Sequence, residues 1–332
     1  MTRHHYLLLV LLVSFCGCIR AVEVTPPASP LTPVVVDEAA AYPSQEPGTK
    51  PPILTGFSQL TKEQLDEGWI QLFDGVSTYG WNLAEGEGKI AVYCRNNVNF
   101  LGGEETNSPK KVLKHNFTNL MYNGKDFVGL KGWATTLKNT SDDFSIRVKP
   151  NDLQPLAEAD WKAASGKCEA KWADGVLELT GGSGMVETAK EYGDFVLQLE
   201  YFTEKGINSG VFFRCIPGEN MNGYECQIFN SPPNSDYEKY LGTDTGGLFR
   251  RQVGRNVGAK NGEWNYMTVA AKGDKFATWV NGIQTTDWTD DRAEHNNPRN
   301  GKRLKPGTIQ LQGHDPSTKI QFRKFRIAEI TE

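Results

Sequence analysis

Short runs of alternating apolar and polar residues recur along most of this 332-residue chain, and they constrain its fold more than any other feature. A period of two is typical of half-buried β-strands, and many short strands separated by Gly, Asn, Asp and Pro favour a sandwich or jelly roll. The predicted strands are Phe144–Val148, Val176–Leu179, Phe195–Phe202, Val211–Cys215, Tyr224–Phe229, Tyr266–Ala271, Ala277–Val280, Thr308–Gln312 and Ile320–Ile327. We therefore predict an all-β jelly-roll sandwich.

Local signals refine this picture at three places. Asn281-Gly282 is the dipeptide that a two-residue hairpin prefers, because both central residues need positive φ. Gly273-Asp274 lies between two further predicted strands and indicates a second hairpin. The segment Thr61–Gly68 has an N-cap threonine, a glutamate in the first turn and a terminal glycine, which predicts one short helix.

The N-terminus has the features of a secretory signal over residues 1–18. A charged start precedes an apolar core, Tyr6–Phe15, that is too short for a stable membrane anchor. Gly17 precedes Cys18, as a lipoprotein signal peptidase requires, although Phe15 stands where a smaller aliphatic residue is usual. Lipid attachment at Cys18 and simple cleavage both stay open. Either outcome places the protein in the periplasm or cell envelope.

The remaining chain divides into three predicted parts. Residues 19–60 contain a Pro/Ala/Glu-rich stretch and form a disordered linker, which serves either as a tether or as a processed leader. Residues 61–150 hold the short helix and an accessory β segment, which is either a small domain or a set of extra strands of the sandwich. Residues 151–332 form the jelly-roll domain.

Charge and cysteine content exclude some classes of function. The chain has 36 Lys+Arg against 40 Asp+Glu and no basic run interleaved with aromatics, so we expect no nucleic-acid partner. The cysteines show no CxxC pair and no finger-like histidine spacing, which argues against structural zinc. Cys215 and Cys226 lie on neighbouring predicted strands, where a disulfide is open but free buried thiols are favoured.

Strand alternation predicts which residues face away from the core. In Phe195–Phe202 the residues at odd positions are apolar core, and the even positions face outward. The outward set over all strands is Gln198, Glu200, Phe202, Phe212, Arg214, Glu225, Gln227, Phe229, Gln310 and Gln312. Amides, carboxylates and flat rings bind sugar hydroxyls and pyranose faces, so we predict a carbohydrate-binding face. An exposed polar sheet with one Arg–Glu pair is the alternative.

The motifs resemble those of the 3-keto-disaccharide hydrolase family. The resemblance is carried by the order and spacing of several short stretches rather than by any one of them. These stretches are Gly184–Asn230, Leu72-Phe73-Asp74-Gly75 with Gly80-Trp81, Thr245-Gly246-Gly247-Leu248, Gly262-Glu263-Trp264-Asn265, Ile309–His314 and Ile320–Ile327. The resemblance implies a concanavalin-A-like jelly roll that cleaves glycosides oxidised at C3, by elimination followed by hydration. The chain departs from the family in a long insertion between Trp81 and Asp160, and in Asn230, where the family often has Asp.

This implied chemistry requires a base near C2, a donor to the enolate oxygen and an acid for the departing O1. We predict Glu225 as base or acid, because a half-buried carboxylate has a raised pKa. Arg214 either holds the developing oxyanion or forms an ion pair with Glu225. His314 at a strand end either shuttles a proton or is a surface or packing residue. The predicted substrate-binding residues are Asn208, Gln227, Glu200, Gln198, Gln312, Phe212 and Asn230.

Cofactors and partners follow less directly. Carboxylate, amide and histidine ligands could hold Ca²⁺ or another divalent metal, but no spacing requires one. The expected partners are a 3-keto sugar or glycan and an upstream sugar oxidoreductase that makes the keto substrate. Two other functions remain open, a non-catalytic carbohydrate-binding module and a structural or adhesion domain.

Overall fold

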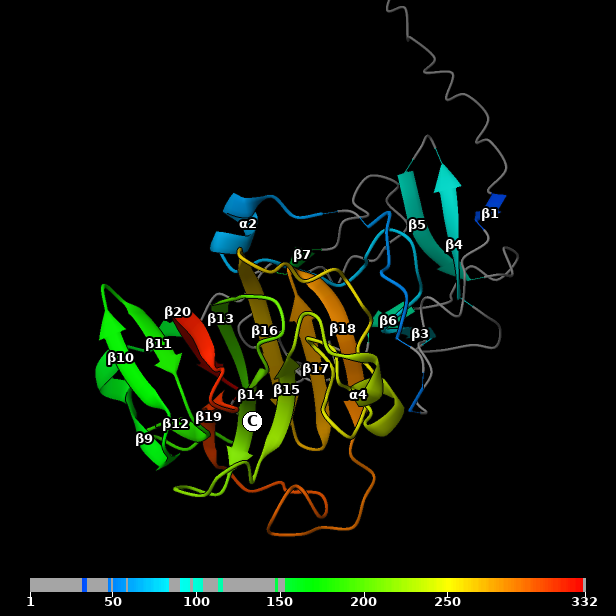
Figure 1. Cartoon of the computed structure of the whole chain (residues 1–332). Coiled ribbons are helices and arrows are strands. Elements are labelled where there is room, and N and C mark those ends of the chain that lie inside the picture. The colour runs from blue at the N-terminus through cyan, green and yellow to red at the C-terminus, as the bar shows by residue number, and fades with distance from the viewer. Residues whose placement is uncertain are drawn as a thin grey trace, which may run out of the picture. The chain divides into compact units, whose positions relative to one another are not determined.

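The protein is described from a computed structural model, which places residues 32–34, 47–48, 50–57, 59–83, 90–95, 98–103, 113–115, 147–148 and 153–330. Two large antiparallel sheets, of eight and five strands, pack face to face and form a β-sandwich (Figure 1). The all-β jelly-roll class predicted from the strand pattern is therefore confirmed.

The larger sheet contains strands from both ends of the jelly-roll region. Its strands, in order across the sheet, are β10 (Glu169–Ala173), β11 (Val176–Thr180), β20 (Lys319–Glu329), β13 (Phe195–Thr203), β16 (Trp264–Lys272), β17 (Lys275–Val280) and β18 (Ile283–Thr289), and β8 (Gln154–Pro155) also pairs with β20. The smaller sheet has the order β15 (Tyr224–Ile228), β14 (Ser209–Cys215), β19 (Thr308–Gly313), β12 (Gly184–Thr188) and β9 (Trp161–Gly166).

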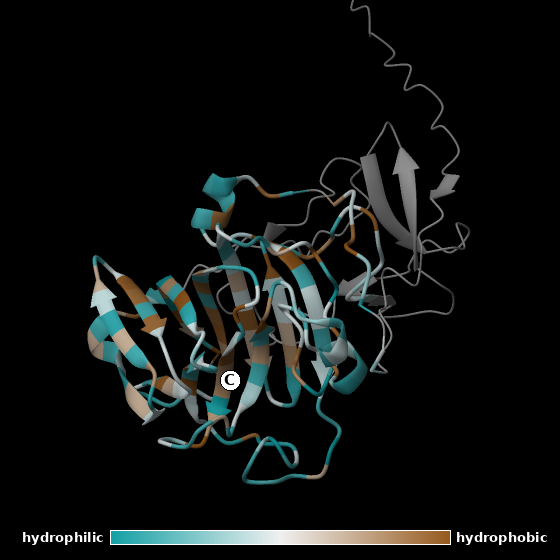
Figure 2. Ribbon diagram, in the orientation of Figure 1, coloured by the Kyte–Doolittle hydropathy of each residue, from teal (hydrophilic) through white to brown (hydrophobic). Residues whose placement is uncertain are grey.

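Alternate residues of both sheets form one apolar core. Phe195, Leu197 and Tyr201 of β13 are fully buried, and they belong to the same cluster as Val211 and Phe213 of β14. Hydrophobic residues occur along the strands of both sheets (Figure 2). Full burial of one such side chain contributes about 1.5–3 kcal/mol, so this shared layer is the main source of stability.

The predicted hairpins are present. Asn281 and Gly282 have φ of 50° and 81° and join β17 to β18, as a two-residue turn with positive φ at both positions requires. The Asn281 Oδ1 also accepts a hydrogen bond of 2.9 Å from the backbone N–H of Tyr266. This bond ties the turn to β16, the strand before the hairpin.

The predicted short helix is α2 (Lys62–Asp66), and it begins with a capping box. The Thr61 hydroxyl accepts from the Gln64 N–H at 3.3 Å, and the Gln64 side chain accepts from the Thr61 N–H at 2.9 Å. A second helix, α4 (Asn234–Lys239), and a 3-10 turn, Glu158–Asp160, are the other helical elements in the described residues. No helix among these residues is long and apolar enough to span a membrane.

Further short strands precede the sandwich. They are β1 (Thr32–Val34), β4 (Ile90–Arg95) and β5 (Val98–Gly103) in one sheet, β2 (Ile70–Gln71) with β7 (Arg147–Val148), and β3 (Trp81–Leu83) with β6 (Leu113–His115). The predicted accessory segment thus contains strands, while its standing as a separate domain stays a prediction. The proposed signal, residues 1–18, lies outside the described residues.

The segment around β2 is joined to the β17–β18 hairpin by polar contacts. The Gln71 N–H donates to the Gly282 carbonyl at 2.9 Å, and the Trp279 indole donates to the Gln71 carbonyl at 3.0 Å. Earlier in the chain, the Leu54 N–H donates to the Asn256 carbonyl at 2.8 Å. Residues near the end of the predicted linker therefore already contact the sandwich.

A buried ion pair completes this attachment. Asp74, in the Leu-Phe-Asp-Gly motif, accepts from the Arg255 guanidinium at 2.5 Å, with side chains 6% and 1% exposed. Asp74 also accepts from the backbone N–H groups of Val76 and Ser77, at 2.8 and 2.7 Å. The Arg255 guanidinium lies 4.4 Å from the Tyr79 ring centroid. Through Asp74, the motif thus attaches the N-terminal segment to the sandwich.

We predict that Asp74→Ala lowers the free energy of unfolding by about 3 kcal/mol, because it leaves the buried Arg255 charge without a partner. Urea denaturation at neutral pH measures this loss. Glu169→Ala, on the exposed edge strand β10, is the control and should change stability by less than about 0.5 kcal/mol. Equal effects of the two substitutions would contradict the role of the ion pair.

Candidate active site

The sandwich has two outer faces, and the predicted site residues are divided between them. Glu225 and Gln227 of β15 and Gln312 of β19 lie on the outer face of the five-stranded sheet. Gln198 and Glu200 belong to β13, in the eight-stranded sheet, so they lie on the opposite side of the core. Our prediction of one shared face was wrong for these two residues. Alternation shows which side of a strand faces outward, but it does not show to which sheet the strand belongs.

Gln198 and Glu200 instead support helix α2. The Gln198 amide donates to the Gly68 carbonyl at 3.0 Å, just after the helix. Glu200 pairs with Arg323 and Lys324 at 2.7 Å each. These contacts attach the helix to the outer face of the larger sheet, so neither residue is placed to meet a substrate beside Glu225.

Glu225 is the buried carboxylate of the five-stranded face, with 5% exposure. Its Oε1 lies where only a glycine leaves room, because a Cβ on Gly210 would approach this oxygen to 2.9 Å. Its Oε2 accepts a hydrogen bond from the Arg299 guanidinium at 2.9 Å. The carboxylate is therefore held between a bare backbone and one cation.

Arg299 is the site residue that the sequence did not predict. It lies in the loop between β18 and β19, where no periodicity indicates its position. Its guanidinium lies 5.1 Å from the Phe212 ring centroid and 5.8 Å from that of Phe249, and its Nε donates to the Met221 carbonyl at 2.7 Å. Stacking between two rings fixes the direction of the group that meets Glu225.

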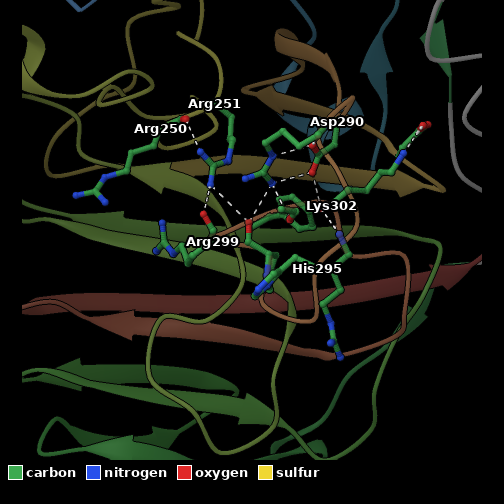
Figure 3. A network of polar contacts seen from close by, with 12 residues as sticks. Arg250, Arg251, Asp290, His295, Arg299 and Lys302 are labelled. Carbon is green, nitrogen blue, oxygen red and sulfur yellow. Dashed lines mark hydrogen bonds and ion pairs between the residues drawn. The ribbon is translucent and has the colours of Figure 1, made fainter.

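Polar contacts fix the loop that carries Arg299. The Arg251 guanidinium donates to the Arg299 carbonyl at 2.9 Å, and Arg292 forms an ion pair of 2.8 Å with the buried Asp290 (Figure 3). Arg292 also donates to the carbonyls of Pro298 and Gly301, at 3.0 and 2.9 Å. Two arginines therefore hold this irregular loop in place.

The electrostatics of Glu225 reflect competing influences. Burial is the largest and raises the pKa of its carboxyl, while the charge and hydrogen bond of Arg299 oppose the rise. The charges of His314 and Arg250 act in the same direction as that of Arg299 and oppose the rise less strongly. The pKa stays above its ordinary value, which suits a group that accepts and returns a proton near neutral pH.

Unpartnered acceptors lie on or beside the same outer face. Asn208 Oδ1, Gln310 Oε1 and Gln312 Oε1 are buried and have no hydrogen-bond partner among the described residues. The Gln312 amide nitrogen contacts the Met221 sulfur at 3.2 Å. Gln227 has its side-chain oxygen on the Ile228 N–H at 3.0 Å, so its amide nitrogen is the group directed elsewhere. Such amides could bind sugar hydroxyls.

His314 and Asn230 occupy different surroundings. The His314 side chain follows β19, is 41% exposed, and its Nδ1 lies 2.8 Å from the Asp315 carboxylate. When Nδ1 donates its N–H to this carboxylate, Nε2 is the ring nitrogen that is left to accept or donate a proton. Asn230 bonds to the Tyr201 and Thr245 hydroxyls at 3.0 and 2.8 Å and to a backbone carbonyl. Its polar atoms are occupied by the protein, so it acts structurally.

Arg214 does not pair with Glu225, and the ion pair we considered was wrong. A register irregularity follows Phe212, and Arg214 has φ of 49°, so the alternation that placed it on the outer face is broken. Its guanidinium is fully buried and binds Asp194 at 2.6 Å and three backbone carbonyls, those of Gly193, Gly273 and Arg303. All its donors serve the sandwich rather than a substrate.

The two strand cysteines also separate. Cys226 belongs to the main core, whereas Cys215 packs with Met185 and Phe212 on the other side of the sheet. Both are free and buried. Within the part of the chain that the structure describes, no group of three or more His, Cys, Asp or Glu side chains is placed to hold a metal ion.

One outer face of this β-sandwich thus carries a buried carboxylate, a cation beside two rings and unpartnered amides. The sequence model of the family described as the 3-keto-alpha-glucoside-1,2-lyase-like domain matches residues 116–328. The chain therefore belongs to this family, the 3-keto-disaccharide hydrolases, as the sequence motifs indicated. Membership identifies a carbohydrate-acting protein of the glycosidase type. No curated protein matches the chain.

Several solved structures are similar to the jelly-roll region. Two come from Parabacteroides distasonis and are described as glycosyl hydrolases. One is 26% identical with a TM-score of 0.40, covering 51% of this chain and 98% of that one, and the other is 20% identical with a TM-score of 0.44, covering 53% and 90%. A carbohydrate-binding module from Bacillus subtilis is 12% identical with a TM-score of 0.33, covering 50% of this chain and 93% of its own.

We predict that Arg299→Gln raises the pKa of Glu225 further, because the main opposing charge is lost and burial continues to act. Carboxyl carbon NMR shifts followed over pH, assigned by difference from Glu225→Gln, measure this change. Lys302→Gln lies in the same loop but near Asp274, at 3.8 Å, and is the control that leaves the pKa in place. An unchanged pKa in Arg299→Gln would refute the pairing.

A second prediction concerns Arg214. Arg214→Lys lowers the free energy of unfolding by about 3 kcal/mol, because an ammonium cannot reproduce the four contacts of the buried guanidinium. The exposed Arg250, replaced in Arg250→Lys, serves as control with a change below about 0.5 kcal/mol. Urea denaturation compares the two, and a wild-type midpoint for Arg214→Lys would show that the network is dispensable.

Proposed function

We propose that this protein cleaves the glycosidic bond of a sugar oxidised at C3, by elimination and then hydration. The observation that carries the proposal is the pair formed by the buried Glu225 and the stacked Arg299 at 2.9 Å. A ketone at C3 acidifies the proton on C2, so a base with a raised pKa beside a fixed cation matches the first step. Membership in the family supports the same substrate class.

In the elimination, the Glu225 carboxylate takes the C2 proton. The C2–H electrons form an enolate with the C3 oxygen, and the Arg299 guanidinium stabilises the negative charge on that oxygen. Collapse of the enolate forms a C1=C2 double bond and breaks the C1–O1 bond. The leaving oxygen takes a proton from His314, and the products are an alcohol and a 2-hydroxy-3-keto-glucal.

In the hydration, water adds back across the new double bond. The hydroxyl joins C1 as His314 takes a proton from the water, and C2 recovers a proton from the Glu225 carboxyl. The net reaction is hydrolysis, and both groups return to their starting states. Asn208, Gln310 and Gln312 lie on or beside the same face, and their side-chain amides are the groups we propose to orient the sugar hydroxyls.

Location and partners form part of the same proposal. The charged start, apolar core and Cys18 support export, to the periplasm or cell envelope, with a lipid anchor or after cleavage. Cleavage of a 3-keto sugar requires an oxidoreductase upstream that removes hydride from C3. The near-balanced charge of the chain supports a function without nucleic acid.

We predict that Glu225→Gln lowers kcat on a 3-keto-glucoside by at least about 10³-fold, because an amide cannot take the C2 proton. The assay follows release of the alcohol from the 3-keto-glucoside and from its unoxidised parent, which should not react. Glu178→Gln makes the same change on the other sheet, where Glu178 accepts from Gln321 at 2.8 Å, and should keep full activity.

The assay also separates the rival function. Binding of the 3-keto-glucoside by the wild-type protein with no product formed would favour a carbohydrate-binding module. Activity that survives in Glu225→Gln would overturn the assignment of the base. Thermal denaturation of both variants establishes that each is folded under the assay conditions.

A further inference from the structure

Positive charge gathers beside the candidate base. Arg250, Arg251 and Arg299 lie on two neighbouring loops near Asp290 (Figure 3). Among the described residues, Arg299 is paired with Glu225, whereas neither Arg250 nor Arg251 forms an ion pair. Arg251 is occupied by backbone carbonyls, and burial together with neighbouring arginines lowers its pKa to about 10. The whole chain carries a formal charge of −4, so this local excess of positive charge is not a general property of the surface.

Arg250 is the cation of this group that faces solvent. Its guanidinium lies 4.8 Å from the Tyr240 ring centroid and 5.3 Å from that of Phe249, and these rings are 5.3 Å apart. In Figure 3 it projects away from the polar network of the loop. Two ring faces therefore hold an exposed cation that has no carboxylate partner in the described part of the chain.

The backbone at Arg250 is unusual for an arginine. Its φ is 61°, in the left-handed region, which is strained for a non-glycine residue; such strain clusters at functional sites. The Arg250 N–H donates to the Leu241 carbonyl at 2.8 Å, which keeps the residue in this conformation. Glycine would adopt this conformation without strain, so the presence of an arginine indicates that its side chain has a role.

The position of Arg250 relative to Glu225 is fixed by the sheet edge. The N–H of Phe249, the residue before Arg250, donates to the Glu225 carbonyl at 3.0 Å. The Phe249 ring lies 5.8 Å from the guanidinium of Arg299, the partner of Glu225, and 5.3 Å from the guanidinium of Arg250. A ligand held at Glu225 therefore has the Arg250 guanidinium within reach of a substituent on the same or the next sugar.

We infer that the site takes an anionic saccharide, whose carboxylate or sulfate group is bound by Arg250 over the rings of Tyr240 and Phe249. The inference rests on the proposed function for the location of the reacting sugar. Guanidinium groups bind carboxylate and sulfate oxygens through two parallel N–H bonds, which makes Arg250 a specificity-determining residue.

Binding measurements test this without any turnover. The probes are 4-nitrophenyl β-glucoside, 4-nitrophenyl β-glucuronide and 4-nitrophenyl β-glucoside 6-sulfate, titrated calorimetrically against the full chain at low salt. The wild-type protein should bind at least one anionic probe about tenfold more tightly than the glucoside, and added salt should reduce this preference. The two anionic probes distinguish a uronate from a sulfated sugar.

Variants assign the preference to Arg250. Arg250→Ala should weaken binding of the preferred anionic probe about tenfold and leave glucoside binding unchanged, while Arg250→Lys keeps part of the preference. Lys319→Ala removes an equally exposed positive charge from β20 and should change nothing.

Several outcomes would overturn the inference. They are equal affinity of the wild-type protein for charged and neutral probes, no anionic binding at millimolar concentration, and equal weakening of all probes by Arg250→Ala. An Arg250-dependent preference for anionic probes, without cleavage of 3-keto-glucosides, would support this inference and contradict the proposed function. Cleavage of 3-keto-glucosides without a charge preference would support the proposed function and contradict this inference.

Discussion

The apolar layer between the two sheets is the constraint on which the other features depend. It uses every second residue of the central strands, such as Phe195 and Leu197 in β13 and Val211 and Phe213 in β14. The residues between them must then face outward, and each sheet presents its own set. On the larger sheet the outward residues contact the segment of helix α2. On the smaller sheet they include Glu225 and the neighbouring amides. The same alternation thus gives one outer face that supports the helix and one that carries the candidate site.

The strand pattern in the sequence predicted the fold and the outward direction of Glu225, Gln227 and Gln312, because period-two burial depends only on neighbouring residues. The pattern failed where contacts between residues far apart in the sequence determine the position of a side chain. Glu200 faces outward as predicted, but pairing with β16 and β20 places it on the other sheet. The irregular register at Arg214 and the aperiodic loop around Arg299 left no local signal, since tertiary contacts determine both positions.

The family motifs have different positions in the structure: one stabilises the fold, and another carries candidate site residues. The Leu-Phe-Asp-Gly motif resembles a site element, because it contains a carboxylate between small residues, but Asp74 is satisfied by Arg255 and by local backbone N–H groups. It attaches the chain before the sandwich to the loop that follows α4. The central motif, in contrast, contains both Gly210 and Glu225, and the bare backbone of the former makes room for the carboxylate of the latter.

The backbone hydrogen bond between Phe249 and Glu225 places an exposed positive charge, that of Arg250, next to a buried carboxylate on a separate segment of the chain. Arg250 projects from the outermost segment and contributes nothing to the main core, whereas Glu225 stands on a fully buried strand. The exposed cation and the buried carboxylate thus depend on different parts of the fold. A substitution at position 250 can therefore alter the charge at the rim without disturbing the strand that holds Glu225.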